Sequence, residues 1–100
     1  DLQKALVSFR FALTLHPNYF EALTSIAGLI PDFDQATIFL GRAYRVRSED
    51  PIWNTILHNF ATAYEKTPEN VYDIIYAQAE AADLEKPLYN IETMKQIMLV

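Results

Sequence analysis

The fold of this chain is decided by the stretch RSEDPIWNTILHNFATAYEKTP, residues 47–68. Proline inside a helix removes a backbone hydrogen bond and clashes with the preceding turn, but it is tolerated in the first turn. We therefore expect one helix to begin at Pro51, with Asp50 as its N-cap, and another to begin at Pro68. The first of these helices carries a continuous apolar face, made of Trp53, Ile56, Leu57, Phe60, Ala61 and Tyr64.

Prolines divide the rest of the chain in the same way. They stand at positions 17, 31, 51, 68 and 87, and each segment between them has apolar residues at helical spacing. The expected helices span 2–16, 19–30 (with Asn18 as cap) and about 34–46, and three more begin near 51, 67 and 90. No segment alternates with the period of a strand, and short connections favour antiparallel neighbours. The sequence predicts an all-α fold of about six antiparallel helices.

Composition limits the kinds of partner. The chain has 100 residues, of which 51% are hydrophobic and 13% aromatic, with a net charge of −5 and no cysteine. An acidic chain lacks the basic footprint that nucleic acids and anionic membranes attract. We also expect no membrane insertion, because no apolar run approaches about 18 residues. The absence of cysteine and of a signal-peptide layout favours a cytoplasmic location. The abrupt ends of the sequence suggest that it is a piece of a longer chain.

Alternate prolines repeat: Pro17 and Pro51 are 34 residues apart, and Pro51 and Pro87 are 36 apart. Small and large apolar residues recur with them. They are Ala5, Phe9, Ala12 and Pro17 in the first unit; Leu23, Ile26, Ala27, Ile30, Ala43 and Pro51 in the second; and Leu57, Phe60, Ala61, Tyr64, Ala77 and Pro87 in the third. Over residues 2–87 this pattern resembles the tetratricopeptide repeat, a helix–turn–helix of about 34 residues.

The resemblance implies an α-solenoid fragment in which helices stack as helix–turn–helix pairs. Its units would be about 1–17, 18–51, 52–87 and 88–100, within a single domain. The sequence departs from the family at Phe39 and Asp73, where a small residue is usual, and prolines replace glycine in two turns. A second register of 51 residues, in which Leu6, Phe9, Ala12 and Pro17 recur as Leu57, Phe60, Ala63 and Pro68, remains open. We favour the 34-residue register.

The function expected from this resemblance is a non-catalytic scaffold that binds a peptide or protein on a concave helical surface. The residues carried over to that surface are Glu21, Thr24, Ser25, Gly28, Thr55, His58, Asn59 and Thr62. Spacing alone also places Thr55, His58, Asn59, Thr62 and Lys66 on one helix face, opposite the apolar face. A face that is simply hydrated is the alternative.

Two charged groups have competing interpretations. Arg42, Arg45 and Arg47 either dock an acidic group or complement a helix C-terminus, with Glu49 and Asp50 beside them to pair. Acidic residues in the last third of the chain, including Asp73 and Glu80, are expected to form a solvated face. Asp32 and Asp34 are expected to cap the helix that follows them.

The other candidate function is structural. A second apolar stripe, formed by Val7, Phe11 and Leu15, gives the first helix two apolar faces. This favours a helical-bundle subunit that self-associates through its first helix. We expect no enzyme, cofactor or metal site, because His16 and His58 lack carboxylate partners in their own helices and the chain has two glycines, too few for a phosphate loop.

Overall fold

The computed structural model describes residues 1–86, and all regular structure in that range is helical, as predicted. The sixth helix expected from about Asn90 lies outside the described residues. The five helices are α1 (Leu2–Leu15), α2 (Phe20–Ala27), α3 (Phe33–Val46), α4 (Ile52–Ala63) and α5 (Pro68–Ala81).

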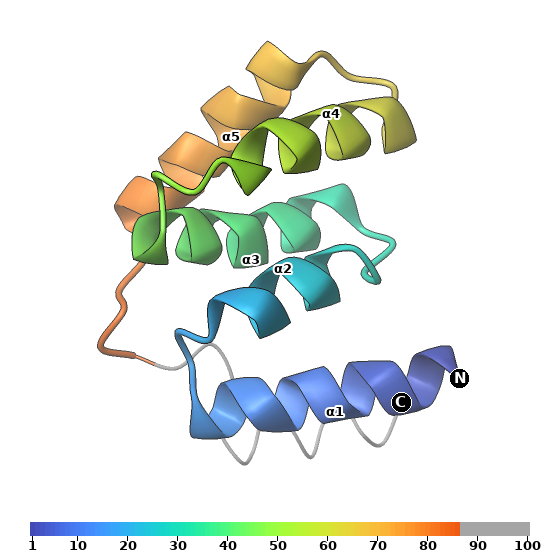
Figure 1. Ribbon diagram of the computed structural model, residues 1–100, viewed down its shortest axis with the longest axis vertical. Coiled ribbons are helices and arrows are strands. Elements are labelled where there is room, and N and C mark those ends of the chain that lie inside the picture. Colours follow the sequence, from blue (N-terminus) through green and yellow to red (C-terminus); the bar gives the residue numbers. More distant parts are fainter. Residues whose placement is uncertain (87–100) are drawn as a thin grey trace.

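The helices form a layered stack (Figure 1). In this view α1, α2, α3 and α4 follow one another along the long axis, and α5 lies alongside α3 and α4. Helix α2 packs between α1 and α3, while α5 packs against both α3 and α4. The most extensive of these contacts joins α3 to α5, which are separated in sequence by the whole of α4.

Polar side chains cap the helices close to the predicted positions. The Asp32 carboxylate accepts from the Gln35 amide at 3.3 Å, and the Thr67 hydroxyl accepts from the Asn70 amide at 3.1 Å. Helix α4 begins at Ile52, one residue after the predicted Pro51, so its N-cap position is Pro51 and not the predicted Asp50; the Asp50 carboxylate still accepts from the Ile52 amide at 3.0 Å. The cap residues therefore supply acceptors for amides that have no partner within the helix.

Helix α2 is shorter than predicted. It was expected over 19–30 with Asn18 as its cap, but it spans Phe20–Ala27, and its N-cap position is Tyr19, which makes no side-chain cap bond. The Ile30 residue before Pro31 is biased away from helical backbone angles, which opposes continuation of the helix to that point. Asn18 has other partners, described below.

The core runs between the stacked helices. Its largest fully buried side chains include Leu13, Leu23, Ile26, Leu40 and Ile75, which come from α1, α2, α3 and α5. Trp53 places α4 against the same core: its ring meets the Phe20 ring edge-on with centroids 5.9 Å apart, and its indole N–H donates to the Arg47 carbonyl at 2.7 Å. The predicted apolar face of α4 is thus its packing face.

Helices α3 and α5 approach each other most closely at Gly41. A Cβ atom at this position would lie 2.4 Å from the Gln78 Cβ and 2.9 Å from the Ala79 nitrogen. No side chain fits in that space, so glycine permits the two backbones to approach. This crossing sets the relative position of the residues that α3 and α5 present together.

Candidate functional site

The three arginines near the end of α3 have different environments. Arg42 is 3% exposed, and its guanidinium donates to the Pro17 carbonyl at 3.1 Å, to the Asn18 side-chain oxygen at 3.0 Å and to backbone carbonyls after α5. Those last acceptors belong to Asp83, Leu84 and Lys86. Burial lowers the pKa of the Arg42 guanidinium, and the nearby Asp83 charge opposes that shift. Arg42 therefore joins the α1–α2 turn to the segment that follows α5.

Arg45 and Arg47 are exposed and engaged elsewhere. The Arg45 guanidinium donates to the Ala79 carbonyl at 2.9 Å and to the Ala82 carbonyl at 3.3 Å, at the C-terminal end of α5. Arg47 pairs with Glu21 at 3.3 Å and with Asp50 at 3.8 Å. The expected neighbour Asp50 is thus one partner of Arg47, and the helix terminus that Arg45 complements is that of α5.

The polar residues predicted on one face of α4 are all exposed, but Lys66 does not lie on the helix, because α4 ends at Ala63 and the backbone turns at Glu65, whose φ is 55°. We call Thr55, His58, Asn59, Thr62 and Lys66 the α4 polar stripe. Within residues 1–86 the side chains of Thr55, Asn59 and Thr62 make no hydrogen bond. The His58 ring nitrogen Nδ1 lies 2.7 Å from the Asn54 carbonyl, and the Lys66 ammonium lies 4.8 Å from the centre of the Phe33 ring. The middle of the stripe therefore offers unengaged donors and acceptors.

The residues predicted on α2 differ from that stripe. Glu21 is engaged with Arg47, and the Thr24 hydroxyl donates to the carbonyls of Phe20 and Glu21 within its own helix. Ser25 and Gly28 are exposed. The Glu21–Arg47–Asp50 chain of charges joins α2 to the start of α4, so the two groups of predicted residues lie on helices that are directly linked.

The apolar stripe on α1 is largely uncovered by the described residues. Phe11 is 48% exposed and Leu15 is 74% exposed, whereas Val7 is half-buried. The opposite face of the helix contributes Leu13 to the core, with Leu6 and Phe9 packed beside it. The first helix therefore has one packing face and one face with large exposed apolar side chains.

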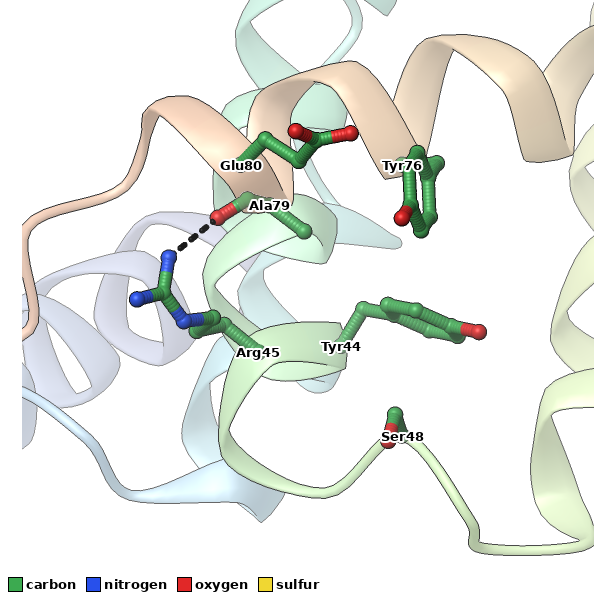
Figure 2. Close-up of a pocket in the computed structure, with 6 residues that line it drawn as sticks. All are labelled: Tyr44, Arg45, Ser48, Tyr76, Ala79 and Glu80. Atoms are coloured by element: carbon green, nitrogen blue, oxygen red, sulfur yellow. Dashed lines mark hydrogen bonds between the residues drawn. The ribbon is translucent and has the colours of Figure 1, made fainter.

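A pocket of about 440 Å³ lies between α3 and α5 (Figure 2). We call it the tyrosine pocket, and its lining residues are Tyr44, Arg45, Ser48, Tyr76, Ala79 and Glu80. Tyr44 comes from the last turns of α3, Ser48 from the connection to α4, and Tyr76 and Glu80 from successive turns of α5. The volume lies within the range of roughly 300–1,000 Å³ that is typical of ligand pockets.

The Tyr44 ring is held by aromatic neighbours. It meets the Trp53 ring edge-on at 5.2 Å, the Tyr72 ring at 5.8 Å and the Tyr76 ring at 6.4 Å between centroids. The hydroxyls of Tyr44 and Tyr72 share a hydrogen bond of 3.3 Å. This bond, together with burial and the two neighbouring tyrosines, raises the pKa of Tyr44. The phenol is therefore neutral at physiological pH. The hydrogen bond to Tyr72 and the three ring contacts also fix the orientation of the Tyr44 ring.

Sequence reasoning did not find this pocket, because its parts belong to α3 and α5 and come together only through the crossing at Gly41. One local signal was present: Tyr72, Tyr76 and Glu80 are spaced four residues apart and therefore lie on neighbouring turns of one helix face. In the sequence alone, the same spacing is equally typical of a helix face that is only exposed to water.

Comparison with known proteins finds no match: no protein-family model, no curated protein and no solved structure is significantly similar to the chain. None of the helices within residues 1–86 has the length and apolar character needed to cross a membrane. In the same range, no group of three or more histidine or acidic side chains is arranged to hold a metal ion.

Proposed function

We propose that this chain is a non-catalytic interaction scaffold that binds a peptide or protein partner along the α4 polar stripe. The observation that carries the proposal is the unengaged state of Thr55, Asn59 and Thr62 on a helix whose other face is anchored by Trp53. Hydrogen-bonding groups on a rigid helix lose little conformational freedom when they bind an extended peptide.

The stacking of the helices supports a repeat architecture for this scaffold. Helix α2 packs on α3 and helix α4 packs on α5, as expected for the helix pairs of units 18–51 and 52–87. Small residues, Gly41 and Ala79, lie at the crossing of α3 and α5. We propose on this basis that the chain is an α-solenoid fragment of tetratricopeptide-like helix pairs, with the 34-residue register.

Peptides selected against the immobilised chain from a random displayed library test this function. We expect selected peptides to lose about tenfold in affinity for the double variant Asn59→Ala, Thr62→Ala, because each lost hydrogen bond contributes about 0.5–1.5 kcal/mol. Fluorescence anisotropy with a labelled peptide measures the change. The matched control is Gln35→Ala, an exposed position on α3 outside the predicted binding residues, which is expected to change affinity less than twofold. Equal binding to the wild type and the double variant would contradict the proposal.

A second function, self-association through α1, is favoured by the exposure of Phe11 and Leu15. In this alternative the chain is a helical-bundle subunit, and burial of such side chains against a second copy contributes about 1.5–3 kcal/mol for each.

Sedimentation equilibrium separates this alternative from the scaffold. If α1 is an assembly face, we expect a dimer or larger species that becomes monomeric in Phe11→Glu, because a carboxylate buried at the interface is strongly unfavourable. Thr55→Glu, an exposed position on α4, serves as the control and is expected to preserve the assembly. A monomeric wild type at all accessible concentrations would exclude self-association.

A further inference from the structure

We propose that the tyrosine pocket binds a lysine or arginine side chain from a basic segment of a partner protein. The pocket shares no residue with the α4 polar stripe, so this site is additional to the one assigned above. It combines aromatic walls, one unpaired carboxylate and a hydroxyl within a single open cavity.

The aromatic walls are suited to a cation. The face of a tyrosine ring is electron-rich and attracts a positive group located within about 6 Å of its centre. Tyr76 is 46% exposed, and its ring stands beside that of Tyr44, which Tyr72 and Trp53 hold in place from behind. The rings therefore need no rearrangement before a ligand enters.

The pocket edge carries one available carboxylate, that of Glu80, and one guanidinium, that of Arg45. Within residues 1–86, no basic side chain forms an ion pair with Glu80, which is exposed. Figure 2 shows the Glu80 carboxylate directed toward the side of Tyr76, while the Arg45 guanidinium lies on the other side of the pocket, bonded to the Ala79 carbonyl. Arg45 bonds to the carbonyls of Ala79 and Ala82 and complements the C-terminal end of α5, but it keeps its positive charge, so the excess negative charge near the pocket comes from the acidic residues along α5.

The surface leading to the pocket has the same sign. Glu69, Asp73, Tyr76 and Glu80 follow one another along a single exposed stripe of α5, at spacings of four, three and four residues. Like charges at such spacing repel each other slightly. A basic segment lying along α5 would relieve that repulsion and place one of its side chains against the exposed ring of Tyr76. The net charge of −5 supports the same sign of partner.

The probe for this site is an octapeptide that alternates serine and lysine, titrated into the isotopically labelled full chain and followed by amide chemical shifts. We expect saturable shifts centred on Ser48, Tyr76 and Glu80, and none with the matching serine–glutamate peptide. Glu80→Gln and Tyr76→Leu are each expected to weaken binding about three- to tenfold at an ionic strength of about 0.1 M.

The control variant is Glu65→Gln, which removes the same charge from an exposed turn between α4 and α5. We expect it to weaken binding less than twofold. Equal weakening by Glu65→Gln and Glu80→Gln would show that the peptide responds to net charge alone and would overturn the proposal, as would the absence of binding or shifts centred elsewhere. Circular dichroism of each variant verifies folding. The double variant Asn59→Ala, Thr62→Ala should leave lysine-peptide binding unchanged. A negative result for the tyrosine pocket is therefore distinguishable from a negative result for the α4 polar stripe.

Discussion

Replacing Gly41 with alanine will lower the free energy of unfolding by about 3 kcal/mol, because an overpacked helix crossing typically costs about 1–3 kcal/mol and occasionally more. The added Cβ would lie 2.4 Å from the Gln78 Cβ and 2.8 Å from the Gln78 carbonyl carbon, both part of or attached to the backbone of α5. Neither can rotate away, so α3 and α5 must separate. Urea unfolding followed by circular dichroism measures the loss.

Gly28 supplies the matched control. Its φ is −70°, which any residue adopts, and a Cβ there would meet the Ser25 carbonyl oxygen at 3.5 Å, an ordinary contact. We expect Gly28→Ala to be neutral or to stabilise the fold by up to about 1 kcal/mol, because alanine restricts the unfolded chain. Similar effects of the two substitutions would show that α3 and α5 do not cross closely at Gly41.

Replacing Arg42 with methionine will lower the free energy of unfolding by about 3 kcal/mol, since hydrogen bonds from charged donors contribute about 1.5–3 kcal/mol each and their loss is partly offset by water. Methionine retains much of the aliphatic volume but leaves the carbonyls of Pro17 and Lys86 without a donor. The turn before α2 and the segment after α5 then lose the guanidinium that binds both, and they keep one direct hydrogen bond, from the Asn18 side-chain amide to the Leu84 carbonyl at 3.2 Å. Denaturant titration measures the change.

Arg45→Met and Arg42→Lys complete this test. Arg45 is exposed and bonds only α5 carbonyls among the described residues, so we expect its loss to cost about 1 kcal/mol. Lysine at position 42 retains the charge but lacks the fork of donors that reaches both segments, and it should recover less than half of the stability. An Arg42→Met chain as stable as Arg45→Met would show that the buried guanidinium does not hold these segments together.

The helices were predictable from sequence because their signals are local. Prolines, caps and apolar spacing act within a few residues, and they locate α3, α4 and α5 to within about two residues at each described start. The predicted length of helix α2 was too great at its C-terminal end. Apolar residues continue after Gly28, but the helical backbone conformation ends there. Ile30 belongs to the core although it follows the end of the helix, and apolar spacing alone does not distinguish such a position from a helical one.

The candidate sites depend on contacts that are distant in sequence. The partners of Arg42 lie 24 to 44 residues away, so a cluster of three arginines gave no indication that one is buried. Tyr44 and Tyr76 meet only because Gly41 allows α3 and α5 to approach. By contrast, exposure of the α4 polar stripe followed from its spacing opposite Trp53. Its binding of a partner, and the repeat register, stay predictions.

The most direct test of the scaffold function is an amide chemical-shift map of the chain with a library-selected peptide. We expect a monomeric complex whose largest shifts fall on residues 54–62 of α4, with smaller shifts on the core helices. Shifts concentrated on Phe11 and Leu15 of α1 would instead identify that helix as the binding face, and they would contradict the assignment of function to α4.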